Sequence, residues 1–176
     1  EDRSRRGSRG RDRCRHARGG VADARGAGVV PGGRGGRGGP VSFGVELQDS
    51  RTYLADEGTP LGSSIANPLD VLQLYGRFDD LPGLLGPGSS STLKLGRQTV
   101  SIGSKRQIER VDFANVIKSY TGLNFRSENA RGDELHAIYV VPTARFPNTR
   151  PALDDNELSG DEEQWQRRIF GLHYRR

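Results

Sequence analysis

The chain has 176 residues, a formal charge of +5 and a pI near 9.8, values that on their own suggest one basic domain. The charge is unevenly placed, because residues 1–40 hold 11 Arg and 4 acidic residues whereas the rest of the chain holds 16 basic and 18 acidic side chains. The body is therefore nearly neutral. The single cysteine, Cys14, lies outside it, which excludes a disulfide or a cysteine-based metal site in the body.

Residues 1–40 consist mainly of Arg, Gly and Ala, a composition that predicts a disordered tail because too little surface can be buried to offset chain entropy. Three interpretations of this tail stay open: an RNA-binding arm built around the RGG-like run 32–39, a solvated linker, or an out-of-frame translation of GC-rich DNA. RGG arms usually interleave aromatic residues, and residues 1–40 contain none.

Membrane and targeting signals are few. No apolar run approaches the ~20 residues that a membrane helix needs, and no apolar segment typical of a signal peptide follows the basic start. The chain begins at Glu1 and contains no Met, so we expect it to be part of a longer protein.

From Val41 onward apolar and polar residues alternate with a period of two, which predicts β-strands. Six strands of roughly 8–12 residues are expected, bounded by Gly, Pro, Asn and Asp. Their alternating runs lie at 43–48, 72–78, 93–102, 123–126, 135–141 and 170–175. The alternation changes parity between Leu95 and Val100, which predicts a bulge or kink near 96–98. Residues 111–119 fit neither period, so a short helix or an irregular loop is expected there.

The expected connections differ in length. They are long at 54–69, 104–118 and 143–164, about a dozen residues at 79–90 and short at 129–133. Transmembrane barrels alternate short periplasmic turns with longer external loops, between strands of ~9–11 residues. A soluble antiparallel sandwich has the same side-chain alternation, so the pattern alone leaves both folds open.

The residues on the polar phase of the strands favour the barrel. In a sandwich this phase faces bulk water and tends towards Lys, Glu and Thr, whereas here it is rich in Arg and Gln, which suit a narrow lumen. The residues concerned are Glu46, Gln48, Gln73, Tyr75, Arg77, Lys94, Arg126 and His136. Aromatic residues lie near the ends of the apolar phase, as in the interface girdles of outer-membrane barrels. These are Phe43, Phe78, Phe125, Tyr139, Phe170 and Tyr174.

Several short motifs follow one another in a fixed order. The most specific is G-R-Q at 96–98, followed by G-S-K-R at 103–106 and R-V-D-F at 110–113; others are V-E-L-Q-D-S-R-T-Y at 45–53 and L-H-A-I-Y-V-V-P at 135–142. Over 41–176 this order and spacing resemble the alginate export family of outer-membrane β-barrels.

The resemblance implies an antiparallel up-and-down transmembrane β-barrel of about eighteen strands, of which this chain supplies about six after its tail. Family members conduct an anionic polysaccharide through an arginine-lined pore in the outer membrane of Gram-negative bacteria. The expected partners are therefore an alginate-like polymer, outer-membrane lipid and periplasmic export machinery. The resemblance implies a monomer. We further expect no nucleic-acid partner, no enzymatic activity, and no cofactor or metal.

The resemblance also implies the pore-lining and substrate-binding residues. The charged lumen cluster of the family matches Arg97, Arg106, Arg110 and Asp112, with Lys94 and Lys105 beside it, and the charged end of its first strand matches Glu46, Asp49 and Arg51. Arginine suits this role because its planar, permanently charged fork pairs with carboxylates. The attraction has to stay shallow so that the polymer is not trapped. An alternative is that the Arg and Asp side chains only pair with each other across the interior.

Two other functions compete with transport. A soluble β-domain with an RGG-like tail that binds RNA would need stacking aromatic residues beside its basic ones, whereas the aromatic residues here lie mostly on the opposite phase. An enzyme has little support, because His16, His136 and His173 lie far apart in the sequence and no nucleophile motif is present. The acidic residues between 154 and 163 fit no calcium-loop motif and favour a solvated loop.

Overall fold

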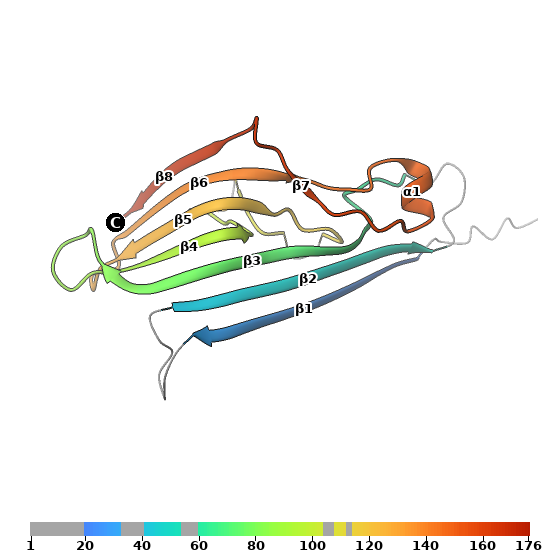
Figure 1. Cartoon of the computed structure of the whole chain (residues 1–176). Helices are drawn as coiled ribbons and strands as arrows, with labels where there is room; N and C mark the ends of the chain where they lie inside the picture. Colours follow the sequence, from blue (N-terminus) through green and yellow to red (C-terminus); the bar gives the residue numbers. More distant parts are fainter. Residues whose placement is uncertain (1–19, 33–40, 54–59, 104–107, 112–113) are drawn as a thin grey trace, which may run out of the picture.

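The computed structural model describes residues 20–32, 41–53, 60–103, 108–111 and 114–176. Seven long strands form one antiparallel sheet, which a two-residue strand, β7 (Glu162–Glu163), joins as the eighth (Figure 1). The long strands are β1 (Gly20–Gly32), β2 (Val41–Tyr53), β3 (Asn67–Pro82), β4 (Ser90–Gln98), β5 (Tyr120–Glu128), β6 (Glu134–Ala144) and β8 (Ile169–Arg175). Each strand from β1 to β6 pairs with its neighbour in the chain, and β8 pairs with β6. Within the described residues the sheet is an open up-and-down meander, not a closed barrel, with β1 and β8 at its edges.

The connection from β6 to β8 carries two small elements. A five-residue helix, α1 (Arg150–Asp154), begins with Pro151 in its first turn, and the two-residue strand β7 (Glu162–Glu163) pairs with Thr143 and Ala144 of β6. Figure 1 shows α1 at the end of the sheet where the long connections lie. No helix of the described residues has the length and apolar character to span a bilayer.

The six strands predicted from period-two alternation correspond to β2, β3, β4, β5, β6 and β8, and the all-β antiparallel class is confirmed. Residues 20–32 of the tail, predicted to be disordered, instead form β1, and all thirteen pair with β2. Composition gave the wrong result here because a ladder of backbone hydrogen bonds needs no apolar side chains. The other residues of the tail lie outside the described part, so a domain boundary at residue 40 stays a prediction.

The predicted kink in β4 falls at a pair of glycines. Gly96 pairs with Gly122 of β5, and both have positive φ, +123° and +154°. A Cβ would lie 2.4 Å from the Leu74 carbonyl oxygen at Gly96 and 2.3 Å from the Tyr139 carbonyl oxygen at Gly122. The pairing of β4 with β5 continues without a register shift to Gln98, so there is no bulge in this ladder at 96–98.

The two faces of the sheet are reversed compared with a soluble sheet. On β2 the buried side chains are polar, namely Glu46, Gln48, Ser50 and Thr52, while Phe43, Val45 and Leu47 are exposed. The registers align the exposed side chains into rows across the strands. One row reads Phe43–Gly76–Leu95–Leu123–Tyr139–Phe170, and the next reads Val41–Phe78–Leu93–Phe125–Ala137–Leu172. We call this apolar side the open face, and the polar side the covered face.

Two connections pack on the covered face. In the 99–119 connection, Val100 packs against Tyr120, Ile138 and Val140, forming the small apolar core. The amide of Gln48 bonds to the backbone of the same connection, at Asn115 O (3.2 Å) and Ile117 N (3.0 Å). The described part of 111–119 is irregular, as one of the two predictions for it allowed.

The 145–168 connection is attached to the end of β2 through one side chain. The Asn156 amide accepts the Thr52 N–H at 2.9 Å and donates to the Thr52 carbonyl oxygen at 2.8 Å. The side chain thus makes the pair of bonds that a neighbouring strand would make, and it fixes this connection across the sheet.

Candidate functional site

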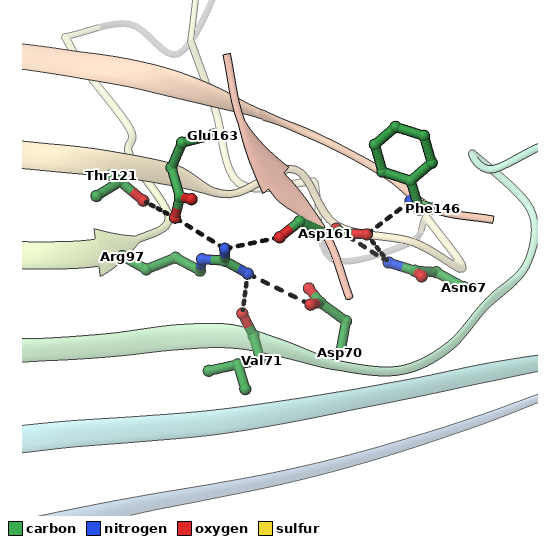
Figure 2. A network of polar contacts seen from close by, with 8 residues as sticks. All are labelled: Asn67, Asp70, Val71, Arg97, Thr121, Phe146, Asp161 and Glu163. Atoms are coloured by element: carbon green, nitrogen blue, oxygen red, sulfur yellow. Dashed lines mark hydrogen bonds and ion pairs between the residues drawn. The ribbon is translucent and has the colours of Figure 1, made fainter. Parts of the chain in front are cut away.

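The guanidinium of Arg97, near the end of β4, is surrounded by acceptors from β3 and from the 145–168 connection (Figure 2). Nη1 lies 3.3 Å from Asp70 Oδ1 and 3.3 Å from the Val71 carbonyl oxygen, both on β3. Nη2 lies 3.1 Å from the Asp161 carbonyl oxygen and 2.8 Å from Glu163 Oε1. Arg97 therefore fixes the 145–168 connection to the covered face.

The ion pairs of Arg97 contribute to the stability of the fold because they are largely buried. The Arg97 side chain is 15% exposed and that of Asp70 is 7% exposed. An ion pair shielded from water to this degree is strongly destabilising to break, because the remaining charge stays buried without its partner. Thr121 Oγ1 also donates a hydrogen bond to Glu163, at 3.1 Å. Arg97 lies closer to Glu163, at 2.8 Å, than to Asp70, at 3.3 Å.

Asp161 lies next to this guanidinium but directs its carboxyl group away from it. Its Oδ1 accepts the Phe146 N–H at 2.8 Å, and the Asn67 amide donates to both carboxyl oxygens at 3.3 and 3.2 Å. Burial raises the pKa of Asp161 to about 7; the Phe146 N–H opposes the rise and the neighbouring carboxyl group of Asp70 adds to it. The carboxyl group of Asp161 therefore keeps its proton to a higher pH than an ordinary aspartate does.

A second ion pair joins the 99–119 connection to β2. Arg110 makes two bonds to Glu46, from Nη1 to Oε2 and from Nη2 to Oε1, each 2.7 Å long. The Gln73 amide of β3 also donates to Glu46 Oε2. This two-pronged geometry is the strongest that Arg forms with a carboxylate, and it satisfies a glutamate that is 6% exposed.

The other predicted site residues are placed differently. Lys94 lies over the ring of Tyr75, with its Nζ 4.9 Å from the ring centre. Asp49 and Arg51 pair with each other at the exposed end of β2, at 2.9 Å. Lys105, Arg106 and Asp112 lie outside the described residues. The structure thus places Arg97 and Arg110 on the covered face, each with its own carboxylate partners, and their role toward a ligand stays a prediction.

Sequence reasoning missed the partners of Arg97. Asp161 and Glu163 belong to the acidic run that was interpreted as a solvated loop, and that interpretation is wrong for these two residues. The available signal was their spacing of two, which places both on one side of an extended segment. No group of three His, Cys, Asp or Glu side chains in the described residues is arranged to hold a metal ion.

Comparison with models of protein families matches residues 2–172 to the family described as Alginate export. The match covers nearly the whole chain, including the tail that the motifs of the sequence left out. Searches of curated proteins and of solved structures give no match.

Proposed function

Because this chain belongs to the alginate export family, we propose that it forms part of the wall of an outer-membrane channel for an anionic, alginate-like polysaccharide. The family is one of transport proteins of the outer membrane, not of enzymes. The substrate and the pore lining are our inference from the described residues.

The reversal of the two faces of the sheet is the observation that carries the proposal. Rows of aliphatic and aromatic side chains lie exposed on the open face, with Leu74 57%, Tyr139 48% and Phe170 81% exposed. A contiguous exposed apolar surface of this kind marks contact with a membrane or a partner. Barrel strands carry such a surface outward toward lipid, with polar residues inward.

The charges of the covered face fit a channel for a polyanion. Arg97 and Arg110 present guanidinium groups that are already paired with carboxylates. Pairing holds these side chains in place and weakens their pull on a passing carboxylate. A conducting pore needs this combination, because binding has to be favourable enough for entry and weak enough for release.

The RNA-binding alternative is less well supported. The exposed aromatic residues of the open face have apolar neighbours in the same rows, as Tyr139 has Leu123 on one side and Phe170 on the other. An RNA-binding surface would instead combine aromatic residues with basic ones.

Conductance measurements on the full-length protein in planar lipid bilayers test the proposal. We expect an open channel whose current is interrupted by a polyuronate at the voltage polarity that drives polyanions through it. A neutral dextran of the same length should cause no such polarity-dependent interruptions. Absence of a channel, or equal interruption by both polymers, would contradict the proposal.

A further inference from the structure

We propose that the covered face holds a discrete binding groove for one or two carboxylated sugar units, in which Lys94 supplies the main free charge. The groove lies at the end of the sheet with the turns 83–89 and 129–133, which is the end away from α1 (Figure 1). The identity of the ligand rests on the proposed function; the groove itself rests on the geometry that follows.

Three neighbouring rows of polar residues build the groove. The registers align Arg77–Lys94–Asn124, then Thr92–Arg126–His136–His173, then Ser90–Glu128–Glu134–Arg175. Residues directly opposite one another share a face of the sheet, and successive rows are two residues apart along each strand. All three rows therefore belong to the same face.

The rows line cavities that are large enough for a small ligand. Two cavities of about 480 and 580 Å³ lie along them, and they adjoin one another because Ser101, Arg126 and His136 line both. We call the two adjoining cavities the groove. The start of the 99–119 connection provides the opposite wall, where Gly103 approaches His173 so closely that a Cβ would lie 2.8 Å from its Nε2. Each volume lies in the range of ~300–1,000 Å³ that is common for small-ligand sites.

The charge balance of the groove favours an anion. Four basic side chains line it, Arg77, Lys94, Arg126 and Arg175, against the two carboxylates of Glu128 and Glu134. Glu134 is shared, since Arg126 lies 3.1 Å and Arg175 2.9 Å from it.

Lys94 differs from the three arginines of the groove. Arg77 pairs with Asp79 at 2.7 Å, whereas no carboxylate among the described residues forms an ion pair with Lys94. Its Nζ instead lies over the Tyr75 ring, an arrangement that leaves ammonium hydrogens for a ligand.

The hydroxyl and amide groups of the groove favour a carboxylated sugar over an anion that has no hydroxyl groups. Ser90, Thr92, Thr99, Ser101 and Asn124 line the same groove between the cations. Ser101 Oγ accepts the Arg110 N–H at 3.0 Å and so keeps its own hydrogen to donate. A uronate offers both chemistries at once, a carboxylate for Lys94 and neighbouring hydroxyls for these groups.

The side chain proposed to bind the ligand is not one of the arginines that hold the fold together. The guanidinium groups of Arg97 and Arg110 hold connections to the sheet and are already paired with carboxylates, so they attract a passing carboxylate only weakly. Lys94 lines the groove without an ion-pair partner among the described residues, so it can bind a carboxylate with no such exchange. Arg126 also lines the groove, where it shares Glu134 with Arg175.

Titration calorimetry of the full-length protein in detergent with a uronate trimer tests the groove, and a neutral trimer serves as the ligand control. We expect Lys94→Gln to weaken uronate binding by about tenfold, the loss typical of one charge-assisted hydrogen bond. Lys118→Gln makes the same chemical change at an exposed lysine on the 99–119 connection and should leave the affinity unchanged. Equal effects of the two variants would overturn the proposal.

Lys94→Arg provides the rescue variant, because it keeps the charge and should retain most of the affinity. Affinity as low as in Lys94→Gln would show that the charge is not what binds. Polymer-dependent current in the bilayer together with trimer binding that ignores Lys94 would overturn the groove and leave the channel intact. Lys94-dependent trimer binding by a protein that forms no channel would support the groove and contradict the channel.

Discussion

Single residues on the covered face hold distant parts of the chain together. Arg97 joins β3 to the 145–168 connection, and Arg110 joins the 99–119 connection to β2. In both cases the carboxylate partner is buried, so the charges stabilise the arrangement only as complete pairs. The arginines that the sequence assigns to ligand contact thus also stabilise the fold.

Asp161 makes stability depend on pH. Its pKa is about 7 in the folded protein, against about 3.9 in an unfolded chain. Between these values the folded state binds more protons than the unfolded state, so the free energy of unfolding falls as pH rises. We expect the contribution to be complete below pH ~4 and lost above pH ~7. Urea midpoints of the protein in detergent, measured from pH 4 to pH 8, check this.

Asp161→Asn should flatten this dependence, because asparagine imitates the protonated acid and can still accept the Phe146 N–H. The exposed Asp155, at the end of α1, is the matched control. Asp155→Asn should leave the slope as it is. A slope that persists in Asp161→Asn would show that another group causes it.

At the scale of elements, the glycine pair between β4 and β5 determines how the strands approach one another. Gly96 and Gly122 both lie against a carbonyl oxygen of the next strand. A side chain at either position would meet backbone that belongs to the pairing ladder and cannot move independently. The kink therefore depends on the absence of two Cβ atoms.

Gly96→Ala should destabilise the protein by about 2 kcal/mol or more, because it combines a φ of +123° with a Cβ only 2.4 Å from the Leu74 carbonyl oxygen. Gly62→Ala is the control, since no atom lies within 4 Å of its added Cβ. Urea unfolding in detergent gives both midpoints. Equal midpoints would mean that β4 adjusts freely around residue 96.

Most of the strands and their up-and-down order could be predicted from the sequence, whereas the side-chain partners of Arg97 could not. Alternation in β2 is clear because this strand has one apolar and one polar face. The strand β1 was missed because its pairing is a property of the backbone. The carboxylates of Asp70 and Glu163 lie 27 and 66 residues from Arg97 in the chain, and no local pattern connects residues so far apart.

At the end of β4, too, the sequence pattern does not predict where a side chain lies. Val100 lies on the changed phase of the apolar–polar alternation, but it lies beyond the ladder, which ends at Gln98, and packs against Tyr120 and Ile138. The sequence pattern predicts only that an apolar side chain is buried. It does not tell whether that side chain lies in a strand or in a loop that covers the sheet. The helix α1, five residues long, is likewise too short to produce a periodic signal.

At the scale of the whole molecule, the reversed faces determine which solvent the sheet fits. In water the rows of the open face would remain exposed, and the covered face would supply only a small apolar core. In lipid the same rows become the stabilising surface. If the proposed function is right, the sheet should therefore be more stable in a bilayer than in water.

The substitution Leu74→Arg tests whether the open face contacts lipid or water. On a lipid-facing strand the charge should cost about 2–4 kcal/mol near the middle of the bilayer, whereas on a water-exposed sheet it should cost less than about 0.5 kcal/mol. Leu158→Arg, at a leucine of similar exposure in the 145–168 connection, is the control and should be tolerated. Urea titration of the protein in lipid vesicles, followed by Trp165 fluorescence, measures both. Equal small effects would argue against a lipid-facing sheet.

The up-and-down order of the strands has a consequence for the kinetics of assembly. Each hairpin joins strands that are adjacent in the chain, and the short turn between β5 and β6 closes with little loss of entropy. The contacts of the 145–168 connection need β2, β3 and β4 to be aligned first. These contacts therefore form late, and weakening them should speed unfolding far more than it slows folding.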